Sequence, residues 1–314
     1  MKNRFLIPAS LAAGAAMLVA AGAAMPAAAQ DAADFYRGKT AEIIISYGPG
    51  GSYDLYGKLA ARHIGNFIPG KPTVIARNMP GAGGLNGANH VYNVAARDGT
   101  AMGVINQNAA LGQALDTGGI KYDVRRFAWI GRFASNNEVF YTWHTAGARS
   151  LETALQRELI AGGTGPTSSS VVMPRAMNQL LGTRFRVVAG YKGSADISLA
   201  MERGEVHGQV RPWAQIKGQS AALLKEKKLD LLVQYTTERH PDIANVPTIV
   251  ELAGTEEARA VFRLLVSGAD IGRALVAPPA LPAGRVATLR GAFDAMVKDA
   301  AFRAEAEKST LEVD

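Results

Sequence analysis

A glycine-rich loop near the start of the sequence could offer backbone N–H groups to an anion. Ala41–Tyr47 is apolar and β-branched, which predicts a buried strand, and helical spacing of apolar residues resumes after Ser52. A helix start leaves N–H groups unpaired and carries the positive end of the helix dipole, so it can bind phosphate or carboxylate. The candidate ligand-binding residues here are Tyr47, Gly48, Pro49, Gly50, Gly51, Ser52, Tyr53 and Asp54. An ordinary strand–helix turn capped by Ser52 is the alternative.

A second loop repeats this chemistry further along the chain. Residues 163–170 read GTGPTSSS and join an expected strand to an expected helix, and their hydroxyl groups add donors to the backbone amides. The candidate ligand-binding residues of this loop are Gly163, Thr164, Gly165, Thr167, Ser168 and Ser169. Two such helix starts would suit a ligand with two anionic ends. Serines that act only as helix caps are the alternative.

Other kinds of chemistry find little support in the sequence. The absence of cysteine excludes disulfides, thiolate metal sites and cysteine nucleophiles. The dinucleotide fingerprint G-x-G-x-x-G begins at Gly48, but its third glycine would fall at Tyr53. There is no G-x-S-x-G, the five histidines lack H-x-x-x-H spacing, and no carboxylate pair suits acid–base catalysis. We therefore predict no catalytic residue, no metal site and no cofactor.

Alternating strand and helix patterns must position the two loops. The expected strands are Ala41–Tyr47, Thr73–Arg77, Ala101–Asn106, Val139–His144, Glu158–Ala161, Arg184–Ala189, Val206–Val210 and Leu229–Tyr235. The helix after Ser168–Ser170 contains Pro174, which we expect in or near its first turn. Short β-α-β connections favour parallel sheets covered by helices. Two such sets predict an α/β protein of two lobes, with any ligand in the cleft between them.

The amino terminus has the pattern of a secretory signal peptide. Lys2 and Arg4 precede the apolar segment Leu6–Met25, and three alanines then provide an A-x-A cleavage site before Gln30. We expect residues 1–29 to be removed near Ala29–Gln30; an uncleaved membrane anchor is the alternative. The net charge of +7 mildly favours anionic ligands, and no run of Lys or Arg marks nucleic-acid binding.

Several segments, in order, resemble one protein family. They are Ile43–Asp54, Ala76–Gly84, Arg97–Thr100, Gly163–Ser170, Tyr191–Gly193 and Pro241–Thr248. Together they are similar to the solute receptors of tripartite tricarboxylate transporters, the Bug-type receptors. The resemblance covers nearly all of the chain after the expected signal peptide, which makes it more specific than either glycine loop alone.

This resemblance implies a periplasmic, two-lobed binding protein without enzymatic activity. Each lobe would be a mainly parallel sheet flanked by helices. Lobe 1 would comprise residues 31–133 plus 238–314, and lobe 2 residues 134–237. A small organic carboxylate would lie in the cleft, held in part by backbone amides, and Asn106, Gln107, Asn108 and Tyr191 would belong to the site. The receptor would deliver its ligand to membrane permease subunits and act as a monomer.

The sequence also departs from the family pattern at positions near the expected ligand. Gly48 stands where many members have proline, and His207 ends the run Gly204–His207 where an aspartate is common. Arg211 replaces an acidic residue, and its guanidinium could pair with a second ligand carboxylate or point to solvent. Two other functions stay open: a secreted α/β enzyme acting on a carboxylated substrate, and a binding protein used for sensing rather than uptake.

Overall fold

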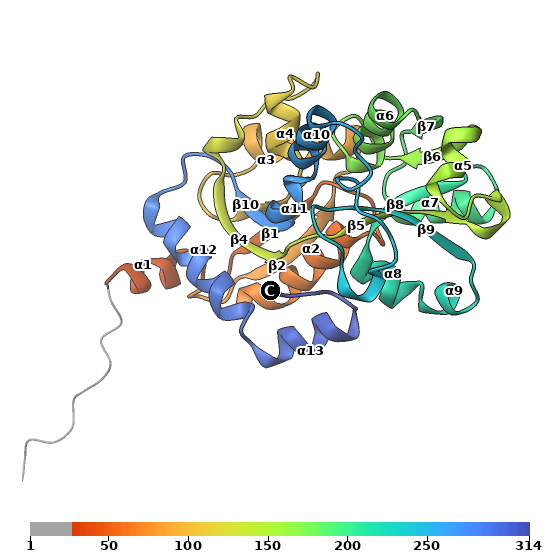
Figure 1. The fold of residues 1–314 in the computed structure, drawn as a ribbon. Helices are drawn as coiled ribbons and strands as arrows, with labels where there is room; N and C mark the ends of the chain where they lie inside the picture. The colour runs from red at the N-terminus through yellow and green to blue at the C-terminus, as the bar shows by residue number, and fades with distance from the viewer. Residues whose placement is uncertain (1–26) are drawn as a thin grey trace, which may run out of the picture.

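The computed structural model describes residues 27–314 and contains two five-stranded sheets, side by side in Figure 1. In the first sheet the strand order is β2-β1-β3-β10-β4. Its strands are β1 (Thr40–Ile45), β2 (Thr73–Asn78), β3 (Ala101–Val104), β4 (Ala128–Ala134) and β10 (Arg273–Ala277). In the second sheet the order is β7-β6-β8-β5-β9. Its strands are β5 (Glu138–Trp143), β6 (Leu159–Gly163), β7 (Phe185–Ala189), β8 (Gly208–Pro212) and β9 (Leu229–Tyr235).

The two sheets share one pattern of strand directions. In the first, β2, β1 and β3 are parallel, whereas β10 is antiparallel to both β3 and β4. In the second, β7, β6 and β8 are parallel, whereas β5 is antiparallel to both β8 and β9. Each sheet is therefore mixed, with one reversed strand in its fourth position. The predicted two-lobed α/β fold is confirmed.

Helices cover both sheets (Figure 1). Those around the first sheet are α1 (Ala27–Tyr36), α2 (Ser52–His63), α3 (Leu85–Asn93), α4 (Ala109–Ala114), α12 (Ala283–Met296) and α13 (Ala300–Lys308). Those around the second are α5 (Leu151–Gln156), α6 (Ser169–Leu181), α7 (Ser194–Glu202), α8 (Trp213–Gln219), α9 (Ala221–Lys225) and α10 (Glu256–Val266). A short helix, α11 (Gly268–Ile271), precedes β10. No helix among residues 27–314 is long and apolar enough to cross a membrane.

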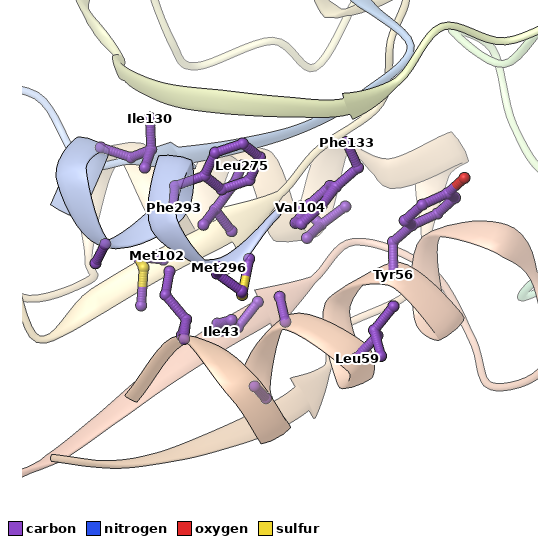
Figure 2. Packing of buried hydrophobic residues seen from close by; sticks show 14 of the residues in the cluster. Ile43, Tyr56, Leu59, Met102, Val104, Ile130, Phe133, Leu275, Phe293 and Met296 are labelled. Atoms are coloured by element: carbon purple, nitrogen blue, oxygen red, sulfur yellow. The ribbon is translucent and has the colours of Figure 1, made fainter. Parts of the chain in front are cut away.

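Apolar side chains pack against both faces of the first sheet. Figure 2 shows one face, where Ile43 and Met102 from the strands meet Phe293 and Met296 from α12. The opposite face buries a separate cluster that includes Ile44. Because both faces are covered, the strands carry continuous apolar runs rather than alternating ones.

The chain crosses between the sheets at two adjacent places. Residues 135–137 join β4 to β5, and residues 267–272 lead back to β10. The backbone N–H of Asn136 donates to the carbonyl of Ala269 at 3.0 Å, so the two crossings are hydrogen-bonded to each other. Glu138 and Arg273 are each the first residue of the strand after a crossing.

Packing places the second crossing later in the sequence than expected. Ile249, Phe262 and Val266 belong to the apolar cluster of the second sheet, together with Phe140 and Met177. The expected return to lobe 1 at residue 238 disagrees with this packing, because burial keeps residues up to 266 with the second sheet. We propose residues 267–272 as the return point.

The structure contains every expected strand and two strands that were not expected. All eight expected strands correspond to β1, β2, β3 and β5–β9, whereas β4 and β10 were not predicted. Pro174 lies in the second turn of α6, because that helix begins at Ser169. The expected signal peptide lies outside the described residues except for its last three, which begin α1, and α1 spans the expected cleavage position.

Candidate functional site

A cavity of about 60 Å³ lies between the two sheets, and both lobes contribute to its walls. The first lobe contributes Tyr47, Gly51, Ser52, Tyr53, Asn106 and Arg273. The second contributes Glu138, Thr164, Ser168, Ser169, Ser170, Gly193, Ser194, Ile197, Val210 and Pro212. Most of these residues are polar, so the cavity is suited to a polar guest rather than to an apolar one.

Three helices begin at this cavity. The N-cap residues are Gly51 for α2, Ser168 for α6 and Gly193 for α7, and none of them makes a side-chain capping hydrogen bond. Each N-cap lines the cavity, as does the first residue of each helix. Apart from the N–H of Val171, which donates to the carbonyl of Ser168, first-turn N–H groups lack a partner within their own helix, and the helix dipole makes these ends positive. The three starts together therefore favour an anion in the cavity.

Asp54 holds the first of these helix starts in place. Its carboxylate accepts hydrogen bonds from the N–H of Gly50 at 2.8 Å and from the side-chain amide of Asn78 at 2.7 Å. Lys58 pairs with the same carboxylate at 2.9 Å. Gly50 has a φ of +87°, a left-handed conformation that glycine adopts without the strain a side chain would introduce. The loop between β1 and α2 is thus fixed before any ligand binds.

Arg273 brings a buried positive charge to the same cavity. Its Nε donates to the hydroxyl of Ser52 at 2.7 Å, its Nη1 donates to the side-chain carbonyl of Gln107, and its guanidinium lies 4.0 Å from the ring centre of Tyr53. The residue is only 2% exposed. The Ser52 hydroxyl therefore orients Arg273. This corrects the expectation that Ser52 caps α2, because Gly51 occupies the cap position.

Glu138 is the acidic residue of the cavity wall. Its Oε1 lies 3.9 Å from Nη2 of Arg273, a long ion pair with both side chains largely buried. The Arg273 fork has a bidentate geometry that carboxylates match, and here Glu138 does not take up that geometry at close range. A ligand carboxylate could approach Arg273 more closely than Glu138 does.

Two stacked tyrosines form part of the apolar wall, which also includes Ile197, Val210 and Pro212. The rings of Tyr47 and Tyr53 are 4.4 Å apart at their centres. The Tyr47 hydroxyl donates to the carbonyl of Gly83 at 2.8 Å, and the Tyr53 hydroxyl accepts from the N–H of Gln107 at 3.0 Å. Burial raises the pKa of both phenols, so they stay protonated at neutral pH. The Tyr53 hydroxyl therefore keeps a proton that it can donate.

The loop after β6 adds hydroxyl groups to the opposite wall. The hydroxyls of Ser168 and Ser170 lie 2.8 Å apart, and the N–H of Thr164 donates to Ser170 at 3.2 Å. The Thr164 hydroxyl is buried and has no partner among the described residues. A buried hydroxyl without a partner costs free energy, which a ligand oxygen at hydrogen-bond distance would recover.

The two lobes touch directly beside the cavity. The side-chain amide of Asn106 donates to the carbonyl of Thr167 at 3.2 Å, and the N–H of Gly48 donates to the carbonyl of Lys192 at 2.8 Å. Gly83 and Gly165 pack backbone against backbone, with no room for a Cβ on either. The structure thus holds the lobes in a closed arrangement.

Solved structures of solute-binding proteins share this architecture. The periplasmic binding protein BugD covers 88% of this chain and 89% of its own, with 18% identity and a TM-score of 0.70. MatC from Rhodopseudomonas palustris with bound malate covers 88% and 90%, with 20% identity and a TM-score of 0.68. An R. palustris protein with adipate has 19% identity and a TM-score of 0.68, covering 88% of both chains. This chain has the fold of the Bug-type periplasmic binding proteins. No family model and no curated protein matches the sequence.

The residues predicted for the site fall into four groups in this Bug-type fold. Those that line the cavity are Tyr47, Gly51, Ser52, Tyr53, Asn106, Thr164, Ser168 and Ser169. Those that lie outside the cavity wall are Gly48, Pro49, Gly50, Asp54, Gln107, Asn108, Gly163, Gly165 and Thr167. Tyr191 packs in the apolar cluster around Val139 and Ile197. Arg211 lines a different pocket, on the other side of α7.

The wall residues that were not predicted are Arg273, Glu138, Ser170, Val210, Pro212 and those at the start of α7. Arg273 begins β10, a strand far along the chain from the two loops, and Glu138 lies one residue before an expected strand. The signals at α7 were the family resemblance of Tyr191–Gly193 and a glycine and serine, Gly193 and Ser194, at a helix start. Within residues 27–314, no group of three or more metal-binding side chains is present.

Proposed function

We propose that the protein is a non-enzymatic solute receptor that binds a small organic carboxylate in the cavity between its lobes. The observation that carries this proposal is the convergence of three uncapped helix starts and buried Arg273 on one cavity. A carboxylate has two oxygens and about four lone-pair positions, so backbone N–H groups from both lobes can bind it at once. The malate and adipate bound to two structural neighbours are consistent with this chemistry.

The size of the cavity narrows the ligand class. A volume of about 60 Å³ offers room for roughly four to six water molecules. This suits an acid of about four carbons in the closed arrangement better than a tricarboxylate or an aromatic acid. Each hydrogen bond to a charged group contributes ~1.5–3 kcal/mol, so a few of them exceed the costs of desolvation and closure and give micromolar binding, about −8 kcal/mol.

Glu138 favours a second candidate, an amino acid of the same size. A carboxylate in the wall repels a dianion but attracts an ammonium group. Aspartate and malate have the same carbon skeleton and differ in an ammonium or a hydroxyl at one carbon. They therefore distinguish the two candidates with little change in shape.

Calorimetric titration of the purified protein with malate, succinate, aspartate and adipate tests the proposal. We expect at least one four-carbon acid to bind with a micromolar dissociation constant and adipate to bind more weakly. Thermal unfolding provides a second readout, because ligand at 100 times its dissociation constant adds about 2.7 kcal/mol of stability. Failure of every acid in the series to bind would refute the carboxylate receptor.

We also propose that the protein is periplasmic and delivers its ligand to membrane permease subunits. The signal-peptide pattern before Gln30 and the fold shared with periplasmic binding proteins support this role. Amino-terminal sequencing of the exported protein should begin at or near Gln30. Deletion of the gene should abolish uptake of the ligand. Normal uptake with a lost response to the ligand would favour a role in sensing. Conversion of the acid by the purified protein would favour the secreted α/β enzyme.

A further inference from the structure

A second pocket lies mainly in the second lobe, on the other side of α7 from the cavity already described, and Gly50 of the first lobe also lines it. Its volume is about 360 Å³. Strands β5, β8 and β9 form its floor, and α7, α8 and α9 form its sides. Ser194 and Ile197 of α7 face the first cavity, whereas Ala195 and Ser198 face the second pocket, so this helix separates the two.

Arg211 lies in the floor of this pocket without an acidic partner. The residue is 7% exposed. Its Nη2 donates to the side-chain carbonyl of Gln219 at 2.6 Å, its Nη1 donates to the hydroxyl of Ser220 at 3.4 Å, and its Nε has no partner. Among residues 27–314 no carboxylate lies within ion-pair distance of it. A buried guanidinium without a counter-charge is costly, and an anion in the pocket would offset that cost.

Gln209 offers an unpaired acceptor in the same floor. Its side-chain nitrogen donates to the hydroxyls of Tyr141 at 2.8 Å and Ser198 at 2.7 Å, and its side-chain oxygen has no partner. Ser198 donates its own proton to the carbonyl of Ser194 at 3.1 Å, so it can only accept from Gln209. This fixes the orientation of the Gln209 amide and leaves its oxygen in need of a donor.

The remaining walls define the rest of a guest. Trp143, Leu223 and Leu229 are apolar, and Leu199 at the rim is an exposed large apolar side chain. Glu202 is exposed and also lines the pocket, where it repels any second negative charge. The floor is thus complementary to a ligand with one carboxylate and one neighbouring hydrogen-bond donor. The sides are complementary to an apolar ligand body.

We propose that this pocket is a second ligand site, which binds a small monocarboxylate that has an apolar body and an O–H or N–H donor beside the carboxylate. The ligand carboxylate forms an ion pair with Arg211 and displaces solvent from it. The neighbouring O–H or N–H of the ligand donates a hydrogen bond to the side-chain oxygen of Gln209. Such a ligand differs from the one proposed for the first cavity. The first cavity is lined mostly by polar residues, and its volume is much smaller than that of the second pocket.

Mandelate, phenylacetate and 2-hydroxyisocaproate are suitable probes, titrated by NMR while the indole N–H signal of Trp143 is followed. We expect mandelate to shift this signal, phenylacetate to bind at least about threefold more weakly because it lacks the hydroxyl, and malate not to displace either. Arg211→Met should weaken mandelate binding at least tenfold, whereas Arg273→Ala should leave it unchanged.

Leu223→Trp gives an independent test that keeps Arg211 in place. The larger side chain fills the pocket and should abolish mandelate binding, whereas Leu264→Trp, at an exposed position on α10, should have no effect. Three results would overturn the proposal: no shift with any of the three acids at millimolar concentration, competition between mandelate and malate, or unchanged mandelate binding in both Arg211→Met and Leu223→Trp.

Discussion

Arg273 and Glu138 decide which charges the cavity between the lobes accepts. Both side chains are largely buried, and they face each other at 3.9 Å, too far apart for a close ion pair. Arg273 is held instead by neutral groups, the hydroxyl of Ser52 and the amide of Gln107. Its charge is therefore only partly compensated and stays available to a ligand carboxylate.

Replacement of Arg273 tests this role. We expect Arg273→Ala to weaken binding of the four-carbon acid by about 2 kcal/mol or more, which is at least roughly 30-fold, because a buried charge loses its partner. Arg273→Lys should recover only part of the loss, since one ammonium cannot reproduce the fork. Calorimetry measures both. Arg186→Ala, at an exposed pair with Glu158, is the control, and an Arg273→Ala protein that binds as tightly as the parent would contradict the assignment.

Glu138→Gln tests the selectivity of the site with almost no change in shape. Removal of the negative charge relieves repulsion of malate and removes attraction for the ammonium group of aspartate. The ratio of malate to aspartate affinity should rise at least tenfold. If the ratio in calorimetric titrations stays the same, Glu138 does not face the ligand and the amino-acid candidate loses its support.

At the scale of elements, two helix starts from different lobes face each other across the cavity. Gly51 caps α2, and a Cβ built on it would lie 3.0 Å from the hydroxyl of Ser194 in the first turn of α7. Its φ is −84°, so the left-handed conformation belongs to Gly50 and not to Gly51. Glycine is needed at residue 51 for close approach between the helix starts rather than for its backbone conformation.

Gly51→Val should therefore fold normally and bind poorly. The isopropyl group meets α7 and blocks the N–H groups of α2, so we expect the affinity for the four-carbon acid to fall at least tenfold. Circular dichroism checks the fold and calorimetry the binding. Gly118→Val places the same side chain where a Cβ meets nothing within 4 Å. Equal affinity in the Gly51 variant and this control would argue against capture by backbone groups.

At the scale of the whole molecule, closure depends on contact between two glycines. A Cβ on Gly83 would lie 2.9 Å from the carbonyl carbon of Gly165, and a Cβ on Gly165 would clash with the backbone nitrogen of Gly83. Backbone atoms cannot move aside as a flexible side chain can. The lobes can therefore close fully only while these positions stay glycine.

Gly165→Ala should hold the lobes apart without unfolding either. The radius of gyration from small-angle X-ray scattering should exceed that of the parent when ligand is present, and affinity should fall, since ligand contacts from both lobes are needed together. Gly291→Ala, at an exposed position in α12 with nothing within 4 Å of the added Cβ, should close normally. A Gly165→Ala protein as compact as this control would show that the glycine contact does not govern closure.

Local patterns in the sequence determined much of the fold. Apolar β-branched runs bounded by glycine located eight of the ten strands, because burial on both faces leaves a continuous apolar stretch that a short window detects. Glycine and serine after β1 and β6 located two of the three helix starts at the cavity, because these residues favour the turn and the start of a helix. Each of these features arises within about ten residues of chain.

Only the tertiary structure decided how the site is completed. Ser52 and Arg273 are 221 residues apart, and they meet because β10 inserts in reverse between β3 and β4. Arg211 and Val210 are neighbours on β8 and face opposite sides of the sheet, and the helices on each side place Arg211 in the second pocket and Val210 at the first cavity. Alternation along a strand shows that neighbours face opposite sides, but only packing against helices decides what each side meets.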